Sequence, residues 1–312
     1  MDIEYLLWLQ NIRERLGPVM EAVFNGISLL GIAALVFGFI IYLCYSKKNG
    51  LFIMITFTLG TVVNNTLKNI VCCYRPWIRD SRVKPSKYAL HGATGYSFPS
   101  GHSQTGACVY GAIGWRYRAK KALKWLMIVL IILVPFSRNY LGVHTPQDVI
   151  VGTLEGLFMV FLTQKIFDLY EKNEHDDFRI MIAGLMLDIV LILFTVFKSY
   201  PLNYENGKLV VDPIVMQADA LKAYGFFAGF LTGGYLEHRY VGFVTEDMNL
   251  KKRIMRLLIT GVPAGIGYLI GHALKGMIGV RTADFIGAFL AMFCVMYIGP
   301  LIFTKLERKQ SH

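Results

Sequence analysis

Residues 51–76 read LFIMITFTLGTVVNNTLKNIVCCYRP. The first part, 51–73, is an apolar run long enough for one helix to cross the hydrocarbon core of a bilayer. The run ends near two basic residues, Lys68 and Arg75, and Pro76 then interrupts regular helix. Since residues seven apart lie on nearly one helical face, we expect Lys68 and Arg75 to project together from the end of a membrane helix.

The rest of the chain repeats this apolar character. Of its 312 residues, 54% are hydrophobic and 17% are charged, which is too apolar for an ordinary soluble globule. Further apolar runs occupy residues 27–45, 104–117, 124–136, 147–167, 180–197, 222–236, 256–274 and 282–303. We therefore predict an all-α fold, a polytopic transmembrane helical bundle of about nine spans.

Residues 1–18 differ from these runs. Charged side chains surround a short apolar core at residues 6–9, without the basic-then-apolar order of a signal peptide. This pattern favours an N-terminal interfacial helix that lies on the membrane surface.

The formal net charge of +11 comes from basic residues gathered in every second connection between the runs. The positive-inside rule makes those connections and the C-terminus cytoplasmic and the N-terminus non-cytoplasmic. This distribution also argues against nucleic acid as a partner. The five cysteines lack metal-ligand spacing, so we expect neither a disulfide framework nor a zinc site.

The connections 74–103 and 137–146 would share the non-cytoplasmic side, although the first is itself basic. Residues 96–104, YSFPSGHSQ, contain a Pro99-Ser100-Gly101-His102 turn just before an apolar run. A turn that opens a helix directs backbone N–H groups, a hydroxyl and an imidazole to one point, which suits a phosphate.

A third cluster begins with Arg138 and continues with His144 and Asp148. Residues 145–148, TPQD, have the form of a helix start, with Thr145 as the N-cap and an acid three positions later. Asp148 can therefore cap the helix, and it can also orient the imidazole of His144. Taken singly, His144 fits an interfacial histidine, and Lys68 and Arg75 fit helix-end anchors whose charges reach the interface.

Together the three clusters resemble the signature of the type 2 phosphatidic acid phosphatase superfamily. Eleven positions between residues 68 and 148 match in order and spacing: Lys68, Arg75 and Pro76; Pro99, Ser100, Gly101 and His102; Ser137, Arg138, His144 and Asp148. The resemblance implies a helical core shared with class A acid phosphatases and vanadium haloperoxidases. It also implies a phosphatase that uses no metal or other cofactor and works through a phosphohistidine.

The resemblance also implies a role for each residue. His144 would be the nucleophile, Asp148 would fix its tautomer, and His102 would protonate the leaving oxygen. The phosphoryl oxygens would be held by Lys68, Arg75, Ser100, the N–H of Gly101 and Arg138. Three cations and a helix N-terminus can replace a metal ion in stabilising phosphoryl transfer, and the sequence has no visible carboxylate cluster for magnesium.

A charged site at the rim of membrane helices is accessible from the headgroup layer, so we expect a lipid phosphate or lipid diphosphate as substrate. The expected topology is also similar to the glucose-6-phosphatase and sphingosine-phosphate phosphatase branches, which leaves a sugar-phosphate phosphatase as an alternative. A non-enzymatic lipid-binding or transport protein with a vestigial site is the other. The presence of both His102 and His144 argues against that alternative.

The hydrophilic stretch 168–179 is the expected internal boundary. Residues 1–168 would hold the interfacial helix and the catalytic helices, and residues 169–312 would add transmembrane helices packed on the same membrane domain. Glycines at four-residue spacing in the last three runs favour close helix packing or a homodimer interface. Asn64 and Asn65 precede Lys68 by four and three positions, so one of them can share its helical face and hydrogen-bond either the phosphate site or a neighbouring helix. Glu155 shares a helical face with Asp148, and Asp188 lies inside the sixth run. The roles of Glu155 and Asp188 stay open.

Overall fold

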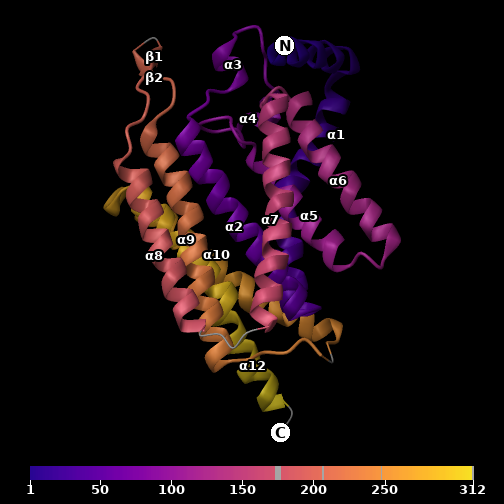
Figure 1. Cartoon of the computed structure of the whole chain (residues 1–312), viewed down its shortest axis with the longest axis vertical. Helices are drawn as coiled ribbons and strands as arrows, with labels where there is room; N and C mark the ends of the chain where they lie inside the picture. Colours follow the sequence, from indigo (N-terminus) through magenta and orange to yellow (C-terminus); the bar gives the residue numbers. More distant parts are fainter. Residues whose placement is uncertain (173–176, 206, 247, 311–312) are drawn as a thin grey trace. The chain divides into compact units, whose positions relative to one another are not determined.

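The computed structural model describes residues 1–172, 177–205, 207–246 and 248–310. Figure 1 shows a chain built almost entirely from helices. They are α1 (Asp2–Cys44), α2 (Lys47–Val71), α3 (Pro76–Arg79), α4 (Lys87–Leu90), α5 (Gly101–Arg116), α6 (Lys121–Tyr140), α7 (Pro146–Lys172), α8 (Asp177–Phe197), α9 (Pro213–Tyr240), α10 (Leu250–Ile278), α11 (Val280–Phe293) and α12 (Gly299–Gln310). Two short strands, β1 (Tyr204–Glu205) and β2 (Lys208–Leu209), pair antiparallel.

Eight of the nine expected spans each fall on one helix, α1, α2 and α5 to α10, and the ninth continues from α11 through a π-helical turn at Cys294–Ile298 into α12. Seven helical stretches within the described ranges are long and apolar enough to cross a membrane. Helix α5, with 16 residues, is not among them. Nor is α9, although it has 28 residues. The prediction of an all-α polytopic bundle is confirmed.

The chain forms two compact units, which are described separately. The first contains Met1–Phe37, Phe52–Lys165 and Ser199–Met216, and the second contains Gly38–Leu51, Ile166–Lys198 and Gln217–His312. Part of the stretch expected to mark a boundary, residues 173–176, lies outside the described residues.

In the first unit, α1 bends at Gly17, where φ is 75°, immediately before Pro18. The helical segment that precedes the bend is the predicted N-terminal helix. It buries Leu9, and its Asp2 forms an ion pair with Arg79 of α3 at 2.8 Å. In Figure 1 this segment, at the end marked N, lies beside the connection between α2 and α5.

Helix α7 packs closely against the beginning of α5. A Cβ added to Gly152 would lie 2.5 Å from the carbonyl oxygen of Ser100, and one added to Gly156 would lie 2.7 Å from that of Gln104. Real Cβ atoms are excluded at such distances, so only glycine permits this approach. The two glycines therefore place the start of α5 directly against α7.

Glycines also bring the helices of the second unit together. Cβ atoms added to Gly225 and Gly229 of α9 would lie 2.3 and 2.5 Å from carbonyl oxygens of α11. One added to Gly271 of α10 would lie 2.4 Å from the Cα atom of Gly287. The predicted role in close packing is confirmed for Gly225, Gly229 and Gly271, whereas Gly261 and Gly265 of α10 have no such neighbour within 4 Å.

Candidate active site

Lys68 lies in the last turn of α2 and reaches the turn that precedes α5. Its Nζ atom donates to the carbonyl oxygen of Pro99 at 2.7 Å and lies 3.4 Å from that of Tyr96. The side chain is therefore held against the predicted phosphate-binding turn.

Arg75 reaches the residues just before that turn, and it does so from a loop. Helix α2 ends at Val71, and Cys72 has a φ of 51°, so the chain leaves the helix before Arg75. The prediction that Lys68 and Arg75 share one helical face is therefore wrong. Arg75 has extended backbone before Pro76, and it donates to the carbonyl oxygens of Gly95 and Thr94 at 3.1 and 2.8 Å.

The turn itself opens α5, as predicted. Helix α5 starts at Gly101, and the Ser100 hydroxyl accepts a hydrogen bond from the N–H of Ser103 as its N-cap. The N–H of Ser100 donates to the carbonyl oxygen of Asp148 at 2.9 Å. This bond fixes the start of α5 to the start of α7.

His144 lies in the loop between α6 and α7 and is fully buried. Its Nε2 atom is 2.9 Å from Nη1 of Arg75, and its Nδ1 atom is 3.4 Å from Oδ2 of Asp148. Arginine only donates hydrogen bonds, so Nε2 of a neutral imidazole must be the acceptor and Nδ1 must carry the proton. This tautomer directs the N–H of His144 toward Asp148.

Asp148 combines the two functions that its sequence position left open. Its Oδ2 atom accepts a hydrogen bond from the N–H of Thr145 at 2.8 Å, and Oγ1 of Thr145 accepts from the N–H of Asp148 at 3.4 Å. These reciprocal bonds form a capping box at the start of α7. The same oxygen faces His144, so capping and orientation are compatible here.

Ser97 is a third partner of this pair, and sequence reasoning missed it. Its hydroxyl donates to Oδ2 of Asp148 at 2.5 Å and lies 3.4 Å from Nδ1 of His144. The side chain is buried. Ser97 is not one of the eleven matched positions, and its place within the turn was the only available signal.

Arg138 and His102 meet at Gly92. In the last turn of α6, Arg138 donates to the hydroxyl of Ser28 at 2.7 Å, and its Nη2 atom lies 3.5 Å from the carbonyl oxygen of Gly92. A Cβ added to Gly92 would lie 3.4 Å from Cε1 of His102. The Nε atom of Arg138 is buried without a hydrogen-bond partner among the described residues.

Both histidines lie outside the seven apolar stretches, and their surroundings oppose a positive charge. Burial lowers the pKa of His144 well below its ordinary value, and the nearby charge of Arg75 lowers it further. Burial likewise lowers the pKa of His102 well below its ordinary value, with Arg138 as the next cause. Both imidazoles are therefore neutral at neutral pH when no anion is bound.

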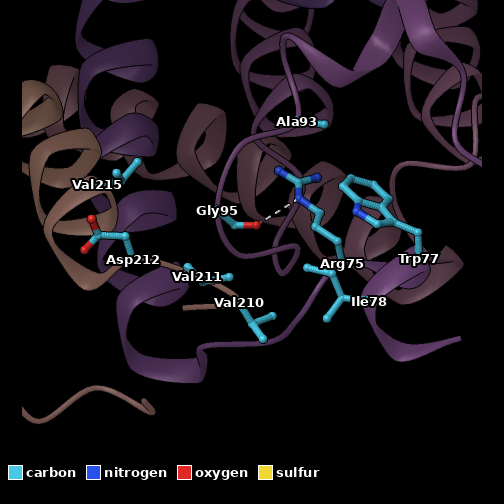
Figure 2. Close-up of a pocket in the computed structure, with 9 residues that line it drawn as sticks. All are labelled: Arg75, Trp77, Ile78, Ala93, Gly95, Val210, Val211, Asp212 and Val215. Carbon is cyan, nitrogen blue, oxygen red and sulfur yellow. Dashed lines mark hydrogen bonds between the residues drawn. The ribbon is translucent and has the colours of Figure 1, made fainter. Parts of the chain in front are cut away.

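A pocket of about 250 Å³ opens beside Arg75 (Figure 2). Most of the side chains that line it are apolar, and the lining residues come from three parts of the first unit. They are Arg75, Trp77, Ile78, Ala93, Gly95, Val210, Val211, Asp212 and Val215. One arginine thus contacts the imidazole of His144 and also lines a cavity.

Two polar residues inside the bundle are partners of each other. Nδ2 of Asn64 on α2 donates to Oε2 of Glu155 on α7 at 2.9 Å, and both side chains are buried. Asn64 therefore joins a neighbouring helix, which is one of the two partners that the sequence allows. No group of three or more His, Cys, Asp or Glu side chains in the described part of the chain is arranged to hold a metal ion.

Comparison with known families places two matches on the chain. The PAP2 superfamily matches residues 49–171, and the family described as PAP2 superfamily phosphatase, transmembrane extension, matches residues 221–311. The chain is 32% identical to phosphatidylglycerophosphatase B of Bacillus subtilis, over 47% of the chain and 75% of the relative.

Two further relatives cover a similar part of the chain. Identity is 33% with an undecaprenyl-diphosphatase of Sulfolobus acidocaldarius, over 39% of the chain and 56% of the relative. It is 29% with the bacitracin transport permease protein BcrC of Bacillus licheniformis, over 45% of the chain and 73% of the relative. No solved structure shows significant similarity to the chain.

These matches and the apolar helices define an integral membrane phosphatase, a hydrolase of phosphoric esters. The chain belongs to the PAP2 superfamily, and its residues 221–311 match the transmembrane extension. The resemblance carried by the three motifs is thereby confirmed.

Proposed function

We propose that this phosphatase removes the terminal phosphate from a lipid phosphate or lipid diphosphate through a phosphohistidine formed on His144. The arrangement of His144 supports this most directly, with Nδ1 facing Asp148 and Nε2 next to a cation that attracts phosphate. The names of two relatives, a phosphatidylglycerophosphatase and an undecaprenyl-diphosphatase, support a lipid substrate.

In the first step, Arg75 turns its N–H donors to the phosphoryl oxygens and uncovers the lone pair of Nε2. Nε2 forms a bond to phosphorus while the bond from phosphorus to the leaving oxygen breaks. The protonated form of His102 donates its proton to that oxygen. Asp148 stabilises the positive charge that develops on His144.

In the second step, water attacks the phosphorus and the bond to Nε2 breaks. His102, now neutral, accepts a proton from the water, and inorganic phosphate leaves. The dianionic phosphate offsets the field of the nearby arginines, which raises the pKa of His102 in the complex and permits its protonation.

The remaining predicted residues bind the phosphoryl oxygens in this proposal: Lys68, Arg75, Ser100, the N–H of Gly101 and Arg138. The buried Nε of Arg138, which lacks a partner among the described residues, supports such a role, because an unpaired buried donor is unfavourable. All eight residues lie within 1–168, to which we assign catalysis. Residues 169–312 are assigned to additional helices on the same membrane domain.

We also place the site on the non-cytoplasmic side of the membrane. The site gathers at the N-terminal end of α5 and the C-terminal end of α6. The connection between these two helices is therefore at their opposite ends, and it contains Arg118, Lys120 and Lys121. The positive-inside rule makes that connection cytoplasmic, with the N-terminus outside and the C-terminus inside.

A panel of phosphate-release assays on the purified protein in EDTA tests the proposal. The substrates are phosphatidate, phosphatidylglycerol phosphate, sphingosine phosphate, undecaprenyl diphosphate and glucose 6-phosphate. We expect release from a lipid, inhibition by vanadate and loss of release in His144→Ala. A clear preference for glucose 6-phosphate would overturn the lipid assignment, and release retained by His144→Ala would exclude the phosphohistidine.

A further inference from the structure

The segment Ser199–Met216 belongs to the first compact unit although it follows α8 in the chain. It contains the β1–β2 pair and the first turn of α9. It lies between the two family matches, which end at residue 171 and begin again at residue 221. Neither match therefore accounts for its position.

Two hydrogen bonds hold this segment beside the cationic residues of the site. The hydroxyl of Tyr200 donates to Oδ1 of Asn69 at 2.7 Å, and Nδ2 of Asn203 donates to the hydroxyl of Tyr74 at 2.9 Å. Asn69 follows Lys68, and Tyr74 precedes Arg75. The segment is thus fastened to the positions next to two predicted phosphate ligands.

The other end of the segment packs against the catalytic turn. The sulfur of Met216 lies 3.3 Å from the backbone nitrogen of Tyr96 and would meet a Cβ placed on Gly95. Tyr96, Val211 and Met216 form one buried apolar cluster. Tyr96 and Ile78, which follows Arg75 by three positions, therefore pack against this segment.

Between these anchors, the segment forms one wall of the pocket beside Arg75. Figure 2 shows Val210, Val211 and Val215 on one side and Arg75, Trp77 and Ile78 on the other. Arg75 also contacts Nε2 of His144, so one side chain joins the pocket to the atom proposed to be phosphorylated.

We propose that this pocket is the leaving-group subsite, and that the segment Ser199–Met216 makes it select an uncharged, apolar group attached to the ester oxygen. The inference rests on the proposed function, because it needs a phosphoryl group on His144. It assigns specificity to a part of the chain outside the phosphatase core.

The chemistry of the walls argues against a second phosphate in this pocket. Three valines and Ile78 offer no hydrogen bonds to an anion, and a phosphate buried among them would lose its hydration. Asp212 is acidic and would repel it. Arg75 is the one basic residue among those that line the pocket, and the proposed function assigns its donors to the phosphoryl group on His144. An alkyl or acylglyceryl group fits these walls better.

The test enlarges one wall residue and measures a ratio of specificities. Val215→Phe fills part of the pocket, and Val215 is exposed, so the variant is expected to fold. Ile214→Phe is the matched control, since Ile214 is an exposed neighbour that does not line the pocket. We compare kcat/KM for dioctanoyl phosphatidate with kcat/KM for acetyl phosphate, whose leaving group is much smaller.

We expect Val215→Phe to lower kcat/KM for phosphatidate about ten-fold relative to kcat/KM for acetyl phosphate, as a steric change in an apolar pocket does. Ile214→Phe should keep the wild-type ratio. An unchanged ratio in Val215→Phe would overturn the subsite. A larger loss of kcat/KM with farnesyl diphosphate than with phosphatidate would also overturn it, because the leaving group of a diphosphate is charged. Failure of the wild-type protein to release phosphate from any lipid would instead overturn the proposed function.

Discussion

Both ring nitrogens of His144 are engaged, by groups that favour opposite charge states of the imidazole. Arg75 at Nε2 disfavours a positive imidazole, and Asp148 at Nδ1 favours the N–H that makes Nε2 nucleophilic. Ser97 bridges His144 and Asp148, because its hydroxyl donates to the same carboxylate oxygen that faces His144. We infer that Ser97 is a positioning residue that acts through Asp148.

Ser97→Ala should lower kcat about ten-fold and change KM less than two-fold. The variant removes a hydrogen bond to a charged, buried carboxylate without touching the phosphoryl group, and such bonds contribute roughly 1.5–3 kcal/mol. Steady-state kinetics on a short-chain lipid phosphate measures the effect. Ser86→Ala is the control, since the buried hydroxyl of Ser86 has no hydrogen-bond partner among the described residues. Equal losses in the two variants would contradict the assignment.

The dependence of activity on pH follows from the neutral state of His144. Its pKa lies well below the ordinary value of 6.5, so the proposed nucleophile is lost only when the pH falls through that lowered value. kcat/KM reports the free enzyme and the free substrate, so the acid limb that is left after correction for the second ionisation of the substrate phosphate should lie below pH 6.5. A titration of kcat/KM between about pH 4.5 and 8 measures it, with an assay of recovery at pH 7 to detect unfolding. A limb at or above pH 6.5 would contradict a buried neutral nucleophile.

At the scale of elements, the site depends on how α2 lies against α7. Lys68 and Asn64 are one turn apart on α2, and Asp148 and Glu155 are two turns apart on α7. The hydrogen bond between Asn64 and Glu155 therefore joins the two helices on the faces that carry site residues. Its position indicates that it sets the separation of Lys68 from the start of α7.

Glu155→Ala should lower kcat/KM about ten-fold, mainly through KM, because Lys68 is proposed to hold the bound phosphate. Glu155→Gln keeps an oxygen that accepts from Asn64 and should recover activity to within about three-fold of wild type, as expected for a hydrogen-bond role. Asn64→Ala should reproduce the loss, and the double alanine variant should be no worse than either single variant. Additive losses would show that the two residues act separately.

At the scale of the whole molecule, the proposed topology has a direct test. In a background without the native cysteines, Ser81→Cys lies in the connection that carries site residues, and Arg118→Cys lies in the connection between α5 and α6. Both positions are exposed. A membrane-impermeant thiol reagent should label Ser81→Cys in intact cells and Arg118→Cys only after permeabilisation. The reverse pattern would place the site in the cytoplasm.

The sequence predicted the fold class and the family of this protein better than it predicted the contacts between individual residues. Apolar run length indicated the helices, and the spacing of the three motifs indicated which residues gather. Arg75 was predicted to lie on the same helix as Lys68, and this was wrong. No pattern in the sequence showed that α2 ends at Val71 or that Cys72 takes a left-handed φ. The spacing of two residues in the sequence predicts that they share a face only while both lie on the same helix. The prediction therefore fails for a residue beyond the end of that helix.

The contacts of Ser97 and Met216 could not be predicted from the sequence, for a related reason. Ser97 meets Asp148 across 51 positions of sequence, and Met216 meets Tyr96 across 120. Such contacts depend on the packing of separate elements, which a single sequence does not encode in any local pattern. The Asn64–Glu155 pair was partly visible, because each residue shares a helical face with a motif residue.

The contact between Arg75 and Nε2 of His144 has a consequence for chemical selectivity. The guanidinium occupies the lone pair that an electrophile would need, so an uncharged alkylating or acylating reagent finds no exposed nitrogen. In the proposed mechanism only an anion with several oxygens draws the arginine away and, in doing so, delivers its own phosphorus to the uncovered atom. In this proposal, the resting enzyme keeps the imidazole of His144 inert toward electrophiles in its surroundings that do not recruit Arg75.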